Sequence, residues 1–264
     1  MASLVGIGDF IGWDGACLLI GKAIRVVPQH SHQAIQIVFG YAGPIGLRHG
    51  DEGDWTQYPL GIVPSRQPHS MDATAATYNA VIFIEPETVS GRALTERYLQ
   101  GGIASIDEAG VREASSKLFT TWLARSGDEA LIAAARQVVK ALTHGEEAGA
   151  VTDKRVIRAV EYVNANLHRQ ITLDDVARAV YLSPGRLRHL FVEQTGMGLR
   201  PYVLWRRFLR AWELLVNGES VSSAAHAAGF ADSAHFARTS RETFGFPPSL
   251  LEVRRTTERA REET

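Results

Sequence analysis

The sequence predicts a multidomain α+β protein: an N-terminal β-domain, a set of helices that follows it, and an all-α C-terminal domain. Three observations predict this fold class. Over residues 15–90, short apolar runs rich in β-branched residues alternate with turn-forming residues, which is typical of a β-barrel or sandwich. From residue 91 onward, apolar residues recur at helical spacing instead. The C-terminal part then contains the same pattern of helix, turn and helix twice.

The N-terminal β-domain is predicted over residues 1–90. Its strands are expected at three apolar runs, Cys17–Ile20, Ile35–Phe39 and Ala80–Ile84. Segments rich in Gly, Pro, Asp and His separate the runs and indicate turns. Cys17 is the only cysteine, which excludes an internal disulfide framework and a cysteine-based zinc finger.

A helical part is predicted over residues 91–143. The apolar spacing indicates three helices, near 91–100, 107–124 and 128–143. These helices either cover the β-domain or form a dimer interface, for which the candidate residues are Val89, Leu94, Tyr98, Leu118 and Trp122. The short polar stretch that follows, 144–151, is predicted to be the interdomain linker.

The all-α C-terminal domain is predicted over residues 152–255 and precedes a charged tail, 256–264. Local signals mark where its helices begin. Thr172 stands three residues before Asp175, as in a capping box. Ser183 is a good N-cap, and the proline after it has no N–H to lose at the first helical position. Helices are expected near 154–167, 173–180, 184–194, 199–217 and 232–243.

Two segments of this domain share one layout. Ala177 precedes the N-cap Ser183 in the first segment, and Ala225 precedes the N-cap Asp232 in the second. A small residue is needed where two helices cross closely, and Gly229 suits a turn with a left-handed backbone. Each segment is therefore predicted to be a short helix, a tight turn and a second helix, and the long helix between them joins the two units.

The residues of this repeat resemble those of the AraC/XylS family of bacterial transcriptional regulators. The resemblance covers roughly residues 152–255 and implies two helix-turn-helix motifs joined by a linker helix, with two recognition helices in successive major-groove segments on one face of DNA, about 34 Å apart. The motifs that carry it are Ile171–Ala177, Ser183 with Leu187 and Phe191, Thr195–Gly196, Tyr202 with Arg207 and Ala211, Ala228–Asp232, Phe236 with Arg238, and Phe244–Gly245 with Pro248–Ser249.

The exposed faces of the recognition helices provide candidate DNA contacts. Arginine is suited to bidentate contact with guanine in the major groove, so the predicted base-reading residues are Arg188, His189, Arg186, Arg238 and Ser233. The predicted phosphate contacts are Arg200, Arg206, Arg210 and Arg241, of which the first three either contact phosphates or stabilise the fold. For Arg207 an intradomain structural role is favoured. Ser240 departs from the family pattern, which usually has an aromatic residue at that place, and predicts looser packing under the second motif.

The N-terminal part resembles the cupin-like sensor barrel that precedes many AraC-type domains. The resemblance rests on the spacing of His30 and His32, then Gln36, then His69. We expect a small-molecule effector, with candidate pocket residues His30, His32, Gln36, Arg48, Trp55 and His69. Three imidazoles suffice for a zinc-type site, but the neutral amide of Gln36 stands where cupins have an acid, so no metal or other cofactor is expected to be required.

Charge divides the chain. Residues 1–150 hold 11 Lys and Arg against 16 Asp and Glu, whereas residues 151–264 hold 17 against 13. A basic C-terminal part suits double-stranded DNA as a partner. We expect a homodimer, with RNA polymerase as a further candidate partner. Neither a signal peptide nor a membrane-spanning run is evident, which favours the cytoplasm.

The function predicted from the sequence is a sequence-specific transcriptional regulator and not an enzyme. Two enzymatic alternatives stay open at this point. One is a metal-dependent cupin enzyme fused to a DNA-binding domain. The other is a protein like the DNA repair alkyltransferases, whose chemistry needs an activated acceptor cysteine; Cys17, in an apolar run, is a poor candidate for it.

Overall fold

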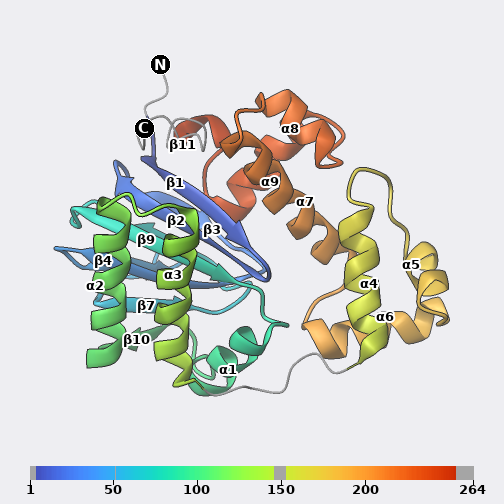
Figure 1. Ribbon diagram of the computed structural model, residues 1–264, viewed down its shortest axis with the longest axis horizontal. Helices are drawn as coiled ribbons and strands as arrows, with labels where there is room; N and C mark the ends of the chain where they lie inside the picture. The colour runs from blue at the N-terminus through green and yellow to red at the C-terminus, as the bar shows by residue number, and fades with distance from the viewer. Residues whose placement is uncertain (1–3, 51, 146–152, 254–264) are drawn as a thin grey trace.

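The computed structural model describes residues 4–50, 52–145 and 153–253. The predicted linker, 144–151, therefore lies largely outside the described residues, and the predicted tail, 256–264, lies wholly outside them. An N-terminal β-domain is covered on one side by helices, and a helical C-terminal part lies beside it (Figure 1). None of the helices in the described ranges is long and apolar enough to cross a membrane.

The β-domain contains two sheets. The larger has the strand order β10-β7-β4-β9-β2-β1-β11 and the smaller the order β3-β8-β5-β6. The strands of the larger sheet are β1 (Gly6–Trp13), β2 (Ala16–Ala23), β4 (Ile35–Tyr41), β7 (Leu60–Val63), β9 (Tyr78–Ile84), β10 (Ala104–Ile106) and β11 (Leu251–Val253). Those of the smaller sheet are β3 (Val27–His30), β5 (Ile45–His49), β6 (Thr56–Tyr58) and β8 (His69–Asp72).

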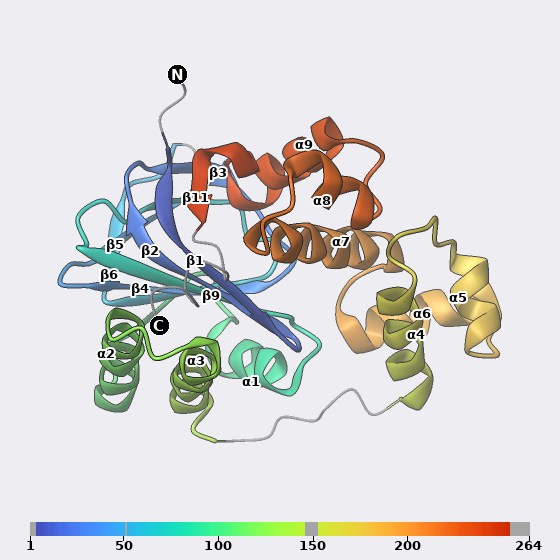
Figure 2. The ribbon, with the colours of Figure 1, turned by 45° about the horizontal axis from the view of Figure 1, so that its top comes forward.

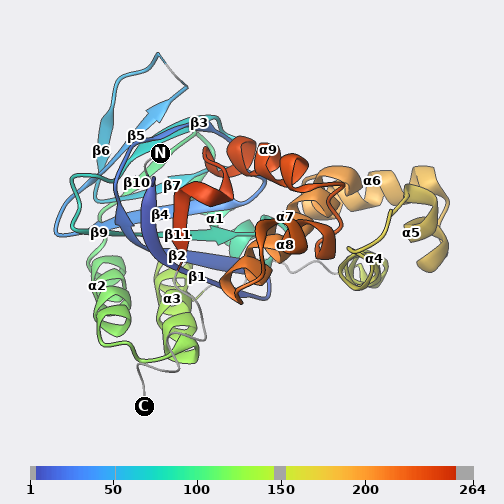
Figure 3. The ribbon, with the colours of Figure 1, turned by 90° about the horizontal axis from the view of Figure 1, so that it is seen from above.

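The predicted cupin-like barrel is wrong in one respect: over the described residues the two sheets do not close into a barrel. The ladder of the larger sheet ends at β10 on one edge and at β11 on the other, and neither strand pairs with the smaller sheet. β11 comes from the C-terminal part and runs parallel to β1, with Gly6 opposite Leu251 (Figure 3). The C-terminal part is therefore not wholly α-helical, and its last strand completes the N-terminal sheet.

Both faces of the larger sheet are buried, because alternate side chains of a strand point to opposite faces. On β9, Ile82 and Ile84 point into the core beneath the helices, whereas Val81 and Phe83 point toward the smaller sheet and the C-terminal part. Three helices cover the first face: α1 (Val89–Tyr98), α2 (Ala109–Leu123) and α3 (Asp128–Thr143). Because both faces are buried, the central strands are continuous apolar runs and do not alternate apolar with polar residues.

The covering helices use most of the predicted dimer residues within their own chain. Leu94, Leu118 and Trp122 are buried in the core shared with the sheet. The indole N–H of Trp122 also donates to the buried carboxylate of Asp9. The structure therefore favours the first alternative for these three residues: they cover the β-domain and are not available to a partner subunit.

The C-terminal part consists of two units joined by one long helix. Its helices are α4 (Lys154–Ala165), α5 (Leu173–Ala179), α6 (Pro184–Thr195), α7 (Leu199–Val216), α8 (Val221–Ala227) and α9 (Ser233–Phe244), followed by a 3-10 turn at Pro248–Leu250. The unit α4–α6 shares a separate core with the first turns of α7 and lies to one side of the β-domain (Figure 2). By contrast, α7–α9 share one continuous core with the β-domain.

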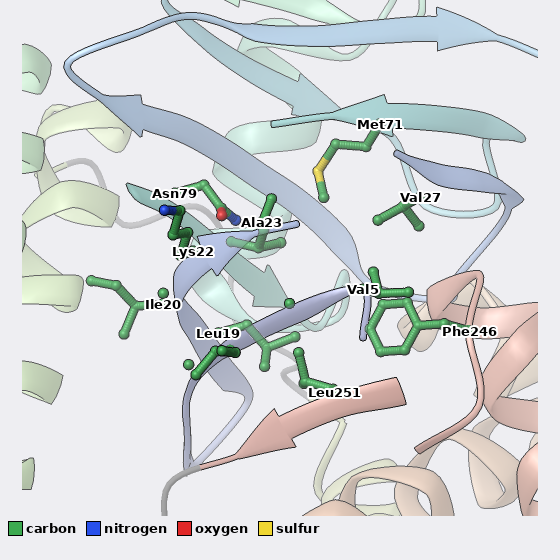
Figure 4. A pocket seen from close by; sticks show the side chains of 15 residues that line it. Val5, Leu19, Ile20, Lys22, Ala23, Val27, Met71, Asn79, Phe246 and Leu251 are labelled. Carbon is green, nitrogen blue, oxygen red and sulfur yellow. The ribbon is translucent and has the colours of Figure 1, made fainter. Parts of the chain in front are cut away.

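A small pocket lies where β1, β2 and β11 meet (Figure 4). Apolar side chains that include Val5, Leu19, Phe246 and Leu251 line it, and its volume is about 70 Å³. It marks the junction at which the C-terminal strand packs on the sheet.

Candidate DNA-binding surface and sensor site

Helix α6 presents the predicted base-reading residues of the first motif. Its first turn is capped by Ser183, whose Oγ accepts a hydrogen bond from the Arg186 amide at 3.3 Å, with a proline at the first helical position. Leu187, Leu190 and Phe191 fix the buried face. Arg186, Arg188 and His189 all lie on the exposed face, as predicted.

The turns of the two motifs share a backbone conformation. Both crossing alanines, Ala177 and Ala225, are buried. Tyr181 in the first turn has φ 57° and Gly229 in the second has φ 86°. A Cβ on Gly229 would lie 2.0 Å from the carbonyl oxygen of Leu167. The second turn therefore needs glycine for two reasons, a left-handed backbone and a close approach to the preceding unit.

Helix α9 presents a smaller set of directional groups. Asp232 caps it by accepting a hydrogen bond from the His235 amide at 2.6 Å. Arg238 and Arg241 are exposed, whereas Ser233 is half-buried. Ser240 is fully buried, and its Oγ donates to the Phe246 carbonyl at 2.7 Å. Ser240 thus makes a polar contact at the place where the sequence resemblance led us to expect looser packing.

The predicted phosphate contacts lie in different environments. Arg200 and Arg241 are exposed, and so is Arg210, which pairs with Glu213 at 3.1 Å. For Arg206 the structure favours a role in the fold over a phosphate contact: its Nη1 lies 2.5 Å from Oε1 of Glu85 on the β-domain, and its side chain is only 20% exposed. Since a buried ion pair holds this guanidinium, it is not placed to contact DNA phosphate in this structure.

Arg207 has the structural role expected of it. Its Nε donates to the Leu167 carbonyl at 3.0 Å and its Nη2 to the Arg169 carbonyl at 2.6 Å. These bonds tie α7 to the loop between α4 and α5. They therefore fix the linker helix relative to the first motif.

One acid, Glu85, joins the β-domain to α7, and a second, Glu87, is buried beside it. Glu85 accepts the indole N–H of Trp205 at 3.3 Å in addition to Arg206. Glu87 is buried beside it, and burial together with the negative charge of Glu85 raises the pKa of Glu87 to about 8. Arg92 on α1 donates to the Gln194 carbonyl near the end of α6. The β-domain therefore contacts both the linker helix and the first recognition helix.

The structure brings four of the six predicted pocket residues together. His30, His32 and His69 each offer a ring nitrogen, and these atoms all lie within 4.8 Å of one another. The Oε1 atom of Gln36 lies 2.9 Å from Nε2 of His32 and 3.4 Å from Nε2 of His69. All four side chains are buried. His30 ends β3, Gln36 is on β4 and His69 begins β8, so the cluster spans both sheets.

Burial keeps the three imidazoles neutral. It lowers the pKa of His32 to about 3 and that of His69 to about 4, and it holds the pKa of His30 well below its usual value. The charges of neighbouring rings act in the same direction on His30 and His32. Burial also raises the pKa of the Cys17 thiol, which is the reverse of the activation that an alkyl-acceptor cysteine needs.

The other two predicted pocket residues lie elsewhere. Arg48 is opposite Ser70 on β8, so its side chain points to the face of the smaller sheet away from His69. Its guanidinium lies 4.9 Å from the ring centre of Trp55, which is 38% exposed. The prediction that they share a pocket with the histidines is wrong, because one position along a strand changes the face.

Sequence reasoning missed a larger recess between the end of β4 and α2. Its volume is about 790 Å³, and its lining includes Tyr41, Gln57, Arg112, Ser115 and Phe119. The lining residues come from separate hairpins and a helix. Only the packing of α2 on the sheet brings them together, so no local pattern could have indicated the recess.

Comparisons with known proteins support the interpretation of the C-terminal part. Residues 176–254 match the family model described as a helix-turn-helix domain. The chain is 34% identical over 97 residues to the regulatory protein PocR of Salmonella typhimurium, covering 36% of this chain and 32% of PocR. The C-terminal part is an AraC-type helix-turn-helix DNA-binding domain. This AraC-type domain is also 36% identical over 90 residues to the transcriptional regulator GbdR of Pseudomonas aeruginosa, covering 34% of this chain and 24% of GbdR.

The chain therefore spans about a third or less of the length of these curated relatives. The likeness to solved structures extends further. Apo ToxT from Vibrio cholerae has a TM-score of 0.59 at 13% identity, over 90% of this chain and 97% of the ToxT chain. ToxT bound to an unsaturated fatty acid has a TM-score of 0.56 at 14% identity, over 91% of this chain and 93% of the ToxT chain. The whole fold, a β-sheet domain followed by an AraC-type domain, is thus shared with ToxT.

Proposed function

We propose that this protein is a sequence-specific transcriptional regulator that binds double-stranded DNA through both helix-turn-helix motifs. The observation that carries the proposal is the pair of matching units, α5–α6 and α8–α9, on either side of α7, each with exposed arginines on its second helix. Two such helices fit successive major-groove segments about one helical turn apart. The relatives of the domain are themselves regulators, so a regulatory role is favoured over an enzymatic one.

The first motif supplies most of the base reading in this proposal. Arg188 and Arg186 can each bond guanine in a bidentate manner, and His189 lies beside them. The second motif relies on Arg238, with Ser233 half-buried next to the cap. The phosphate contacts are Arg200, Arg210 and Arg241, which position the protein on the duplex.

The β-domain acts as the sensor in this proposal. It shares a core with α7–α9 and contacts α6 through Arg92, so a ligand that shifts the β-domain also shifts the recognition helices. Such a ligand must bind one arrangement better than another. A ToxT structure with a bound fatty acid is a precedent for an effector on this fold. We further propose that the protein acts as a homodimer, with RNA polymerase as a partner at the promoter.

Selection of binding sites from random DNA tests the proposal. The full-length protein should enrich a site with two conserved blocks whose centres lie about 10 base pairs apart. Arg188→Ala should lose base preference at one position of one block, whereas Arg241→Ala should weaken all sequences alike and lower the salt slope by about 1. An unenriched pool would refute DNA recognition, and an unchanged Arg188→Ala site would refute the base assignment.

A further inference from the structure

The histidine cluster has a feature that its residue types alone do not reveal: every Nδ1 atom faces a backbone carbonyl. The three distances are 2.9, 2.7 and 2.9 Å, from His30 to Pro28, from His32 to Ala34 and from His69 to Gln67. A carbonyl oxygen can only accept a hydrogen bond, so each Nδ1 carries the ring proton. Each Nε2 then carries a free lone pair. Metal-binding histidines show the same arrangement, with the second nitrogen donating to a carbonyl.

The side-chain oxygen of Gln36 places further lone pairs next to those of the histidine Nε2 atoms. This atom, Oε1, lies beside Nε2 of both His32 and His69, and an amide oxygen cannot donate a hydrogen bond to them. Two arrangements would satisfy these atoms: a cation that accepts the lone pairs, or a rotated amide whose NH₂ group donates to the rings. The rotated amide reaches the rings of His32 and His69 only, whereas one metal ion would take a lone pair from all three rings.

We propose that His30, His32 and His69 bind one divalent transition-metal ion through Nε2, and that this ion is an input to the regulator. Imidazole prefers ions of the zinc, nickel and iron class to calcium or magnesium. Three protein ligands leave a fourth position for water or a small anion. The second half of the proposal rests on the regulatory function proposed above, whereas the metal site itself does not.

Binding of such an ion moves the strand that carries His30. The ring nitrogens lie up to 4.8 Å apart. Around a tetrahedral ion with metal–nitrogen distances of about 2.0–2.1 Å, they would be about 3.3 Å apart. The ion therefore draws the rings together, and the pairing of β3 with β8, which carries His30 and His69, is already irregular between Val27 and His30.

The same strand contacts the second recognition helix. The Ser31 N–H, one residue after β3, donates to the Glu242 carbonyl of α9 at 3.1 Å. At the end of α9, a Cβ on Gly245 would lie 2.6 Å from Val27 and 3.0 Å from the Pro28 oxygen. Movement of β3 is thus transmitted to the end of α9 through a backbone hydrogen bond and direct packing.

An aromatic route runs parallel to this backbone contact. The His32 ring packs edge-on against Phe83 with 5.0 Å between ring centres. Phe83 in turn stacks on Phe244 of α9, with 4.9 Å between centres and 20° between planes. Two of the three proposed ligands therefore connect to α9, by different contacts.

The metal site is tested on full-length protein without a histidine tag. After treatment with a chelator and dialysis against Zn²⁺, we expect one tightly bound equivalent by elemental analysis, and Co²⁺ should give the visible bands of a tetrahedral site. His69→Gln and His30→Gln should lose the bound equivalent, while the exposed His168→Gln should keep it. Wild type without a tight equivalent, or a folded His69→Gln that retains it, overturns the proposal.

The coupling to α9 is tested with a matched pair. Ser31→Pro removes the N–H that reaches Glu242, and proline suits the extended backbone of His30 before it. Ser31→Ala keeps the N–H. We expect Zn²⁺ to change the affinity of wild type and Ser31→Ala for the selected DNA site severalfold, and Ser31→Pro to bind Co²⁺ with an unchanged spectrum but lose this response.

These outcomes separate the two proposals. If metal-free and metal-loaded wild type bind the selected site equally, the ion is structural and its role as an input is refuted, while DNA recognition stands. If no DNA site is selected in either form, the proposed function fails, and the stoichiometry of the metal site is still decided by the Zn²⁺ and Co²⁺ measurements.

Discussion

Replacing Arg206 by Met tests the buried contact between the β-domain and α7. The Arg206 side chain is 20% exposed and that of its partner Glu85 only 6%. An exposed ion pair contributes at most about 1 kcal/mol, but removal of one partner of a buried pair leaves an uncompensated charge and costs about 3–5 kcal/mol. Because Glu87 is buried beside Glu85, we expect Arg206→Met to lower the free energy of unfolding by about 3–5 kcal/mol.

The assay is guanidinium chloride unfolding of the full chain, followed by tryptophan fluorescence, to which Trp205 and Trp212 in the shared core contribute. Arg200→Met, at an exposed position of the same helix, is the matched control and should stay within about 0.5 kcal/mol of wild type. In a double-mutant cycle with Glu85→Gln, the two losses should fall short of additivity by about 1–3 kcal/mol. A loss below about 1 kcal/mol, or an additive cycle, would refute the reasoning.

Three further predictions concern recognition, pH and backbone. Arg238→Ala should reduce affinity for the selected DNA site less than Arg188→Ala does in an anisotropy titration at fixed salt, because α9 presents fewer directional groups. The reverse order would contradict the proposal that the first motif supplies most of the base reading. The folded Glu87 carboxyl, with its pKa of about 8, keeps a proton that the unfolded chain loses above its usual pKa of 4.5. Between pH 6.5 and 7.5 the loss of this proton lowers stability by up to about 1.4 kcal/mol per unit. The three buried histidines, whose pKa folding lowers, change stability in the opposite direction in wild type and Glu87→Gln alike, so the difference between the two proteins in chemical unfolding should show the Glu87 slope. Gly229→Ala should lower the melting temperature clearly, since its Cβ meets a carbonyl at 2.0 Å, whereas Gly185→Ala, with open space around it, should be neutral or stabilising.

Local signals in the sequence were sufficient for most helix boundaries. The predicted capping box at Thr172 and Asp175 is present, and Ser183 and Asp232 cap the helices they were expected to begin. Helix α3 spans residues 128–143 as predicted. Caps act within one turn, so the residues that determine them are adjacent in the sequence.

Strands were harder to predict where they are rich in glycine or lie at an edge of a sheet. β1 was missed although Asp14–Gly15 joins it to β2 in a two-residue hairpin, a strong signal for paired strands. β11 could not be foreseen, because its partner β1 is more than 200 residues away. Closure of the sheets into a barrel likewise depends on pairing between distant edges, which apolar periodicity does not specify.

The candidate sites show the same division between local and distant contacts. His30, His32 and His69 were predicted as a group, and the structure brings them together. For Arg206, on the predicted linker helix, the sequence left open a phosphate contact or a role in stabilising the fold. Its partner Glu85 lies 121 residues away, so only the tertiary structure reveals that the charge is buried.

The central claim is that both helix-turn-helix motifs read DNA side by side on one face of the duplex. Hydroxyl-radical footprinting on the selected site tests it most directly. We predict two protected tracts, with centres about 10 base pairs apart, and the selective loss of one tract in Arg188→Ala and of the other in Arg238→Ala. A single protected tract that both variants weaken equally would contradict the claim.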